Sequence, residues 1–256
     1  MTIETIKWKY VTNCPVCGSS ESQISVQTIP INILKCQHCL VQFSQSVQSD
    51  VDIQRYYQED FSSERHRFGQ MMNASINYHL IESARLLTET TKILDVGCGY
   101  GYLLEMIRLN SSRIAELSGI EISRVERNHS LNLGSGRFQV YEELKNVPDD
   151  KFDLVVCNEV IEHIAQPLPF LNEIYKKLKK NGKLFLLTDN FDSKIVAGMG
   201  ASFPKWIPHS HVVHFGPNSL EHIFSLSNFN LHSQFMFFTP FEVWCQWIIF
   251  KLKKIL

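Results

Sequence analysis

Short apolar runs alternate with amphipathic, helix-length segments from residue 92 onward. The apolar runs fit strands of a buried sheet and occupy residues 92–96, 117–122, 138–141, 152–157, 183–188 and 231–238. Between them, apolar residues recur at helical spacing in residues 102–109, 123–132, 168–180 and 219–226. Strands that alternate with helices form βαβ units. The pattern therefore predicts an α/β domain over residues 91–256 with a doubly wound, mostly parallel sheet.

The N-terminal third of the chain follows a different pattern. Residues 45–90 are polar at first and then carry apolar side chains at helical spacing, which predicts a helical bridge. Residues 1–44 hold short β-like runs between paired cysteines. We therefore expect three units, 1–44, 45–90 and 91–256. The last contains the segment 191–217, a long insertion of the kind that often forms a lid or binding loop.

Four of the seven cysteines stand in two C-x-x-C turns. They are Cys14, Cys17, Cys36 and Cys39. Thiolates at this spacing form the tetrahedral site of a zinc ribbon, and a complete set of four thiolates leaves no position open for catalysis. His38, inside the second turn, is expected to be exposed rather than a ligand. A region this small lacks the core to fold alone, so we predict one structural Zn²⁺.

A glycine-rich turn follows the first strand of the α/β domain. Gly97, Gly99 and Gly101 let the backbone turn sharply and approach a ligand, and Asp95 just ahead of them is expected to organise the loop amides. Their spacing, G-x-G-x-G, differs from the G-x-G-x-x-G of dinucleotide-binding folds. Glu121 ends the next strand, where a carboxylate can accept hydrogen bonds from both hydroxyls of a ribose. A ligand would then lie across the carboxyl ends of the strands.

Four motifs in order resemble the class I S-adenosylmethionine-dependent methyltransferases. They are ILDVGCGYG, GIEIS, FDLVVCNEVIEHI and LKKNGKLFLLT, and the resemblance covers roughly residues 90–230. It implies a Rossmann-like fold with S-adenosylmethionine as cofactor, held at its methionine end by the glycine loop and at its ribose by Glu121. It also implies that Asn158 lies near the methyl group. Glu142 is the candidate on the adenine side, but it equally fits a solvated turn.

Two histidines are candidates for the general base that helps a hydroxyl acceptor react. His211 is the first candidate, because it lies in the insertion 191–217 and the stretch from His211 to Leu220 resembles the corresponding segment of zinc-ribbon methyltransferases. His163, just after the fourth strand, is the second. Each also fits a structural role as a loop anchor. Tyr57 is expected either to help close the site or simply to pack.

Charge and composition narrow the partners. The formal net charge is −1, and residues 1–50 hold three lysines against three acidic residues, so nucleic acid is not the expected partner. No apolar run reaches the ~20 residues of a membrane span, and Met1–Tyr10 does not resemble a secretory signal, so we expect the cytoplasm. The aromatic tail 241–256 is expected either to cover the sheet edge or to touch a membrane surface peripherally.

The sequence thus predicts a methyltransferase that uses S-adenosylmethionine and modifies O, N or C of a sugar or another small metabolite, lipid- or glycan-linked intermediates included. Two other interpretations stay open. A ribosomal RNA methyltransferase would use the zinc ribbon to bind RNA. A non-catalytic scaffold would bind the cofactor and dock a partner through the ribbon.

Overall fold

A five-stranded parallel sheet forms the centre of the computed structural model, which describes residues 8–29, 31–60, 64–87, 91–111, 114, 116–207 and 210–234. Its strands are β6 (Lys92–Val96), β7 (Glu116–Ile120), β8 (Gln139–Tyr141), β9 (Phe152–Asn158) and β10 (Leu178–Leu187), in the order β10-β9-β6-β7-β8. The chain runs outward from β6 to β8 and then returns to β9. Strand order therefore switches between β6 and β9, where open α/β sheets bind their ligands.

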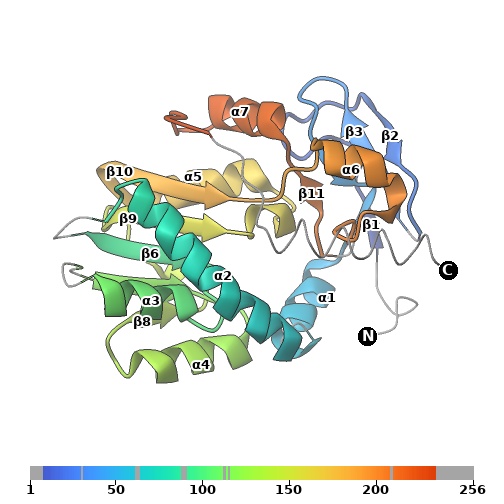
Figure 1. Ribbon diagram of the computed structural model, residues 1–256. Helices are drawn as coiled ribbons and strands as arrows, with labels where there is room; N and C mark the ends of the chain where they lie inside the picture. Colours follow the sequence, from blue (N-terminus) through green and yellow to red (C-terminus); the bar gives the residue numbers. More distant parts are fainter. Residues whose placement is uncertain are drawn as a thin grey trace.

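Helices cover both faces of this sheet (Figure 1). On one face, α2 (Glu64–Ser83) and α3 (Tyr102–Asn110) share a core with Ile93. On the other face, α5 (Pro167–Lys177) shares a core with Leu94. Neighbouring strand residues point to opposite faces, so the continuous apolar runs of the sequence are explained by burial on both sides. The doubly wound fold predicted from the sequence is confirmed.

A second sheet joins segments that lie far apart in the sequence. Three of its strands come from the N-terminal region and one, β11 (Val213–His214), comes from the insertion 191–217. The N-terminal strands are β2 (Ser22–Val26), β3 (Ile33–Cys36) and β4 (Gln42–Ser44), and the order is β11-β4-β3-β2 with all neighbours antiparallel. The division into three units stays a prediction, but the first and third of them share this sheet.

The described chain contains several further elements outside these two sheets. β1 (Trp8–Tyr10) and β5 (Ser46–Gln48) form an antiparallel pair. α1 (Asp50–Arg55) and a π-helical turn, Tyr56–Asp60, precede α2. α4 (Arg124–Gly134) follows β7, α6 (Lys194–Met199) lies in the insertion, and α7 (Pro217–Leu226) follows β11. Short 3-10 turns occupy Leu144–Asn146, Ile161–His163 and Gly200–Ser202.

The structure differs from the predicted elements at two places. The helix expected to reach 180 ends at Lys177, because Leu178 already pairs with Phe152 of β9. The Asn-Gly pair expected to stop that helix lies instead in an irregular part of β10, with Asn181 left-handed at φ 66°. Residues 231–234 are not in a strand, and the remainder of that predicted strand and the tail 241–256 lie outside the described residues. Within the described chain, no helix combines the length and apolar character needed to span a membrane.

Candidate functional site

The point where strand order switches is lined by the ends of β6 and β9. Val96 pairs with Cys157, so Gly97 and Asn158, which follow them, lie side by side. Both amide atoms of Asn158 are buried and lack a hydrogen-bond partner among the described residues. Because buried polar groups are normally paired, this side chain fits one that meets a ligand. The role predicted for Asn158, beside the methyl carbon of the cofactor, stays a prediction.

Glu121 and Glu142 follow the next two strands at the same edge. The amide of Glu121 donates to the carbonyl of Tyr141 at 3.0 Å, which sets Glu142 one residue beyond. Arg127 links the two, because its guanidinium donates to the Glu121 carbonyl at 2.7 Å and lies 3.4 Å from the Glu142 carboxylate. The Glu142 side chain is half exposed. Its ion pair with Arg127 places it near the site without assigning it to a ligand.

The conformation of the glycine loop is set by its own backbone and by hydrogen bonds to Glu121. Gly97, Gly99 and Gly101 have φ of 74°, 53° and 83°, the left-handed region where a side chain is strained. The Glu121 carboxylate accepts hydrogen bonds from the amide of Gly99 at 2.9 Å and from the amide of Ser123 at 2.7 Å. It therefore ties the loop to the start of α4, which begins at the predicted Ser123 N-cap.

Two buried carboxyl groups lie close together below this loop. Burial, and then the charge of Glu121, raises the pKa of Asp95 to about 8. Burial likewise raises the pKa of Glu121 to about 7, against the lowering effect of its two backbone donors. We expected Asp95 to organise the loop amides, but Glu121 holds the Gly99 amide instead. Asp95 lies within β6 two residues before the loop, whereas Glu121 comes from the neighbouring strand end.

The sequence did not reveal that α2 covers the glycine loop. The Gln70 side-chain oxygen accepts a hydrogen bond from the amide of Tyr100 at 2.9 Å, and its nitrogen donates to Glu126 at 3.1 Å. A Cβ added at Gly99 would collide with the Gln70 side chain. A polar residue on an exposed-looking helix gave no signal of this contact, because the helix is distant from the loop in sequence.

His163 is held by a network from two other segments. Its Nδ1 lies 3.0 Å from the carbonyl oxygen of Ser210, 3.1 Å from the Ser210 hydroxyl and 3.0 Å from the Tyr57 hydroxyl. Burial lowers the pKa of His163 to about 4, so the ring is neutral at pH 7. A carbonyl only accepts, so Nδ1 carries the proton and the lone pair of the neutral ring lies on Nε2. Tyr57, expected either to close the site or to pack, lies against the candidate base.

The structure brings the second candidate base against the first. The rings of His211 and His163 meet edge to face with centroids 4.7 Å apart. Burial lowers the pKa of His211 to about 2, with a further contribution from His163. The next histidine, His214, is buried between Phe191 and Trp206, and neither of its ring nitrogens has a partner within the described part of the chain. Of the three, His163 keeps the pKa nearest to neutral.

Glu162, beside His163, is a buried carboxyl group. Burial, followed by the charge of Asp189, raises its pKa to about 8. One of its oxygens accepts a hydrogen bond from the Thr188 hydroxyl at 2.9 Å. The protonated form is therefore favoured at pH 7, which keeps a negative charge away from the neutral histidine. The E-H pair picked out in the sequence thus combines two neutral polar groups.

The four paired cysteines form one cluster whose sulfurs all lie within 4.8 Å of one another. The Sγ atoms are 3.4 Å apart in one pair, Cys14 and Cys39, and 3.6 Å apart in the other, Cys17 and Cys36. Zinc–thiolate bonds of ~2.3 Å in a tetrahedron place neighbouring sulfurs ~3.8 Å apart. The donor set therefore fits a zinc ion. His38 lies outside it, largely exposed and 3.3 Å from Glu21.

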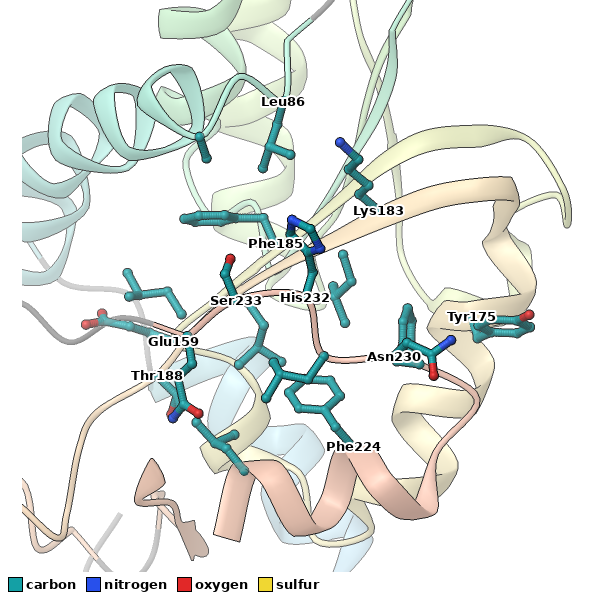
Figure 2. Close-up of a pocket in the computed structure, with 18 of the residues that line it drawn as sticks. Leu86, Glu159, Tyr175, Lys183, Phe185, Thr188, Phe224, Asn230, His232 and Ser233 are labelled. Carbon is teal, nitrogen blue, oxygen red and sulfur yellow. The ribbon is translucent and has the colours of Figure 1, made fainter. Parts of the chain in front are cut away.

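A large cavity of about 1250 Å³ runs along the β10 edge of the sheet (Figure 2). Apolar side chains such as Leu86, Phe185 and Phe224 face it, with Glu159 and Thr188 at one end. Neither the glycine loop nor Glu121 lines it. Glu159, which directly follows Asn158, does line it, so the cavity reaches the carboxyl end of β9. Residues 231–234 follow its wall, and the chain continues from there outside the described residues.

Comparison with known proteins agrees with this geometry. The family described as "Methyltransferase domain" matches residues 53–234. Curated relatives include ubiquinone biosynthesis O-methyltransferases from Xanthomonas axonopodis pv. citri, 40% identical over 112 residues, and Xanthomonas euvesicatoria pv. vesicatoria, 39% identical over 112 residues. These alignments cover 42% of this chain and 47% of each relative. The chain thus spans about half the length of the curated relatives it matches.

Solved structures with a similar arrangement include a SAM-dependent methyltransferase from Aquifex aeolicus. Its identity is 18% and its TM-score 0.44, over 56% of this chain and 74% of that one. Another is PKMT2 from Rickettsia typhi in complex with AdoHcy, with 25% identity and a TM-score of 0.36 over 39% of this chain and 21% of that one. The family match extends over most of the chain and includes the glycine loop, Glu121 and Asn158. This chain therefore belongs to the methyltransferase domain family, as a class I S-adenosylmethionine-dependent member.

Proposed function

We propose that the protein transfers the methyl group of S-adenosylmethionine to a hydroxyl oxygen of a small molecule. An oxygen acceptor is proposed because of the protonation state of His163. Its Nδ1 faces the Ser210 carbonyl and the ring is neutral, so Nε2 is available as a proton acceptor. The curated relatives named as O-methyltransferases add support from sequence.

The residues at the switch point are suited to hold the cofactor. The loop from Gly97 to Gly101 would approach its methionine end, Glu121 its ribose hydroxyls, and Asn158 the region of the methyl group. Asp95 would meet the ammonium group, and Glu142 stays a candidate on the adenine side. Bound S-adenosylmethionine supplies an electrophilic methyl carbon on a sulfonium.

The chain's own contribution is alignment and proton transfer. Methyl transfer is an in-line displacement, so the protein must orient the acceptor oxygen and exclude water. As the new carbon–oxygen bond forms, the hydroxyl proton would pass to Nε2 of His163, while S-adenosylhomocysteine leaves. We place His163 first as base, because the lower pKa of His211 makes that ring the weaker proton acceptor. His211 would wall the acceptor beside it.

The four cysteines are assigned to one structural zinc ion. Their separation supports this role, and so does the burial of Cys14, Cys36 and Cys39 within a core that includes Ile161 of the α/β domain. The same packing speaks against a ribbon that extends outward to bind RNA. A neutral balance of charge over residues 1–50 points the same way.

The test is a transfer assay with a radiolabelled methyl donor and four acceptor classes: phenols, hexoses, primary amines and ribosomal RNA. We expect label in hydroxyl acceptors, and a 10²–10⁴-fold lower rate in His163→Ala with unchanged cofactor affinity. Label found only in RNA or in amines would refute the proposal. A full-rate His163→Ala enzyme would remove this residue from the mechanism, and His211→Ala then tests the remaining candidate.

A further inference from the structure

Strand β11 is bonded to the zinc-ribbon region on one side. Val213 pairs with Phe43 in an antiparallel register. The Ser44 amide donates to the Val212 carbonyl at 2.9 Å, and the Ser44 hydroxyl donates to the His211 carbonyl at 3.3 Å. Strand β4 thus holds the backbone of the very segment that carries His211.

The same segment is bonded to the catalytic domain on its other side. The Val212 amide donates to the Glu162 carbonyl at 2.8 Å. The Ser210 carbonyl accepts the hydrogen bond from Nδ1 of His163, and the His211 ring packs on the His163 ring. Residues 210–214 are therefore a bridge between β4 and the turn that carries His163.

The apolar core is continuous across this bridge. One buried cluster contains three cysteines of the two C-x-x-C turns together with residues of β4, β11 and the catalytic domain. Its members include Cys14, Cys36, Cys39, Val41, Phe43, Ile161, Leu171, Val212, Val213 and Phe215. The two C-x-x-C turns therefore share one apolar core with β4 and β11. By contrast, the glycine loop is held by Glu121 and Gln70, which belong neither to the ribbon nor to residues 210–214.

We propose that the ribbon is a positioning element for the acceptor side of the site: through β4 and β11 it fixes residues 210–214 against His163. Ser44 and Phe43 are its positioning residues. The inference rests on the proposed function, because it gives His163 the role of base. Loss of the ribbon's attachment would move the Ser210 carbonyl away from Nδ1 of His163. The tautomer with the proton on Nδ1 and the lone pair on Nε2 would then no longer be favoured. Cofactor binding would persist.

The test replaces the bond donor on the ribbon side and reads the bond on the catalytic side. Ser44→Pro removes the amide N–H that donates to the Val212 carbonyl. The matched control is Ile24→Pro, which places a proline in β2 at the opposite edge of the same sheet. Measured quantities are zinc content, affinity for S-adenosylhomocysteine, hydrogen exchange of the Val212 amide, and kcat and KM for the acceptor.

For Ser44→Pro we expect one zinc per chain and cofactor affinity within twofold of the wild type. We also expect the Val212 amide to exchange at least tenfold faster and kcat to fall at least tenfold. Ile24→Pro should keep both values near those of the wild type. Unchanged Val212 exchange would overturn the coupling, and faster exchange with unchanged kcat would overturn its role in positioning.

A second measurement keeps the inference testable if Ser44→Pro does not fold. Chelation of the metal from the wild-type protein should accelerate Val212 exchange and leave cofactor affinity within twofold, and added Zn²⁺ should reverse the change. Metal-independent exchange at Val212 would overturn the proposal. A wild-type protein that transfers no methyl group would refute the proposed function instead, because the exchange and metal measurements do not depend on turnover.

Discussion

Replacing Glu121 by alanine is the sharpest perturbation of the proposed cofactor site. The side chain is nearly fully buried, and each of its oxygens accepts a backbone hydrogen bond, one from Gly99 and one from Ser123. A carboxylate offers about four acceptor positions. Two therefore remain for the hydroxyls of a ribose. The variant would lose the loop anchor and the ligand contact together.

The magnitude follows from these bonds. Hydrogen bonds to a charged group contribute about 1.5–3 kcal/mol each. Loss of a single ribose contact should weaken binding by about 1.5–3 kcal/mol, which is a factor of roughly 10 to 150, and loss of both contacts should weaken it further. The orphaned amide of Gly99 adds about 1–3 kcal/mol to the loss of folding stability. Affinity and stability should therefore fall together.

Calorimetry with S-adenosylhomocysteine measures the affinity, and thermal unfolding measures the stability. Glu143→Ala is the matched control, because the Glu143 carboxylate, two residues after the end of β8, is half exposed and pairs with Lys145. We expect the control to bind like the wild type. A Glu121→Ala protein that is folded and binds within twofold of the wild type would refute the assignment of Glu121 to the cofactor, and so would a wild-type protein that does not bind.

Three further predictions test other parts of the structure. Elemental analysis should give one zinc per chain, less than half an equivalent in Cys17→Ser, and an unchanged value in Cys157→Ala, whose thiol lies in the sheet. Gly99→Ala should weaken cofactor binding at least tenfold by calorimetry, and adding Gln70→Ala should restore only part of the loss, because the positive φ remains strained. The pKa of Glu121 is raised to about 7, and ribose donors favour its charged form, so binding should release protons near pH 7 and tighten from pH 6 to pH 8. Calorimetry in two buffers of different ionisation enthalpy measures that release.

Residues at strand ends were predictable because the apolar runs of the sequence and the order of the strands are enough to place them. The run 92–96 became β6 at those bounds. Gly97 and Glu121 follow β6 and β7, Asn158 is the last residue of β9, and the carboxyl ends of these three strands meet at one edge. A parallel sheet leaves little freedom in such positions. The cysteine cluster was predictable for a similar reason, since two C-x-x-C turns need only come together to bring four sulfurs to tetrahedral spacing.

Contacts between distant segments were not predictable, because nothing local specifies them. Val213 and Phe43 are apolar residues that would fit any buried strand, and their pairing depends on how the insertion returns to the ribbon. Gln70 likewise reaches the glycine loop only through the packing of α2 on α3. The extent of α5 depends on register, since pairing of Leu178 with β9 ends the helix before its Asn-Gly stop signal.

The electrostatics of the histidines carry information about the acceptor that motifs cannot. Burial lowers the pKa of His163 to about 4, so the ring stays neutral but is a weak base. A phenol ionises near pKa ~10, whereas an aliphatic hydroxyl lies closer to water at ~15.7. The difference of about 6 units corresponds to about 8 kcal/mol in the proton transfer. If His163 is the base of the proposed O-methylation, we therefore expect a phenolic hydroxyl to react faster than that of a sugar.

A series of phenols tests this argument. Electron-withdrawing substituents lower the pKa of the acceptor, so its proton leaves with less help from the base. The rate loss in His163→Ala should therefore shrink steadily along the series from unsubstituted to nitro-substituted catechol, and hexoses should react at least 10³-fold more slowly than the phenols. Equal rates for hexoses and phenols, or a His163→Ala penalty independent of acceptor pKa, would contradict it, because either result would separate the chemistry from the basicity of this histidine.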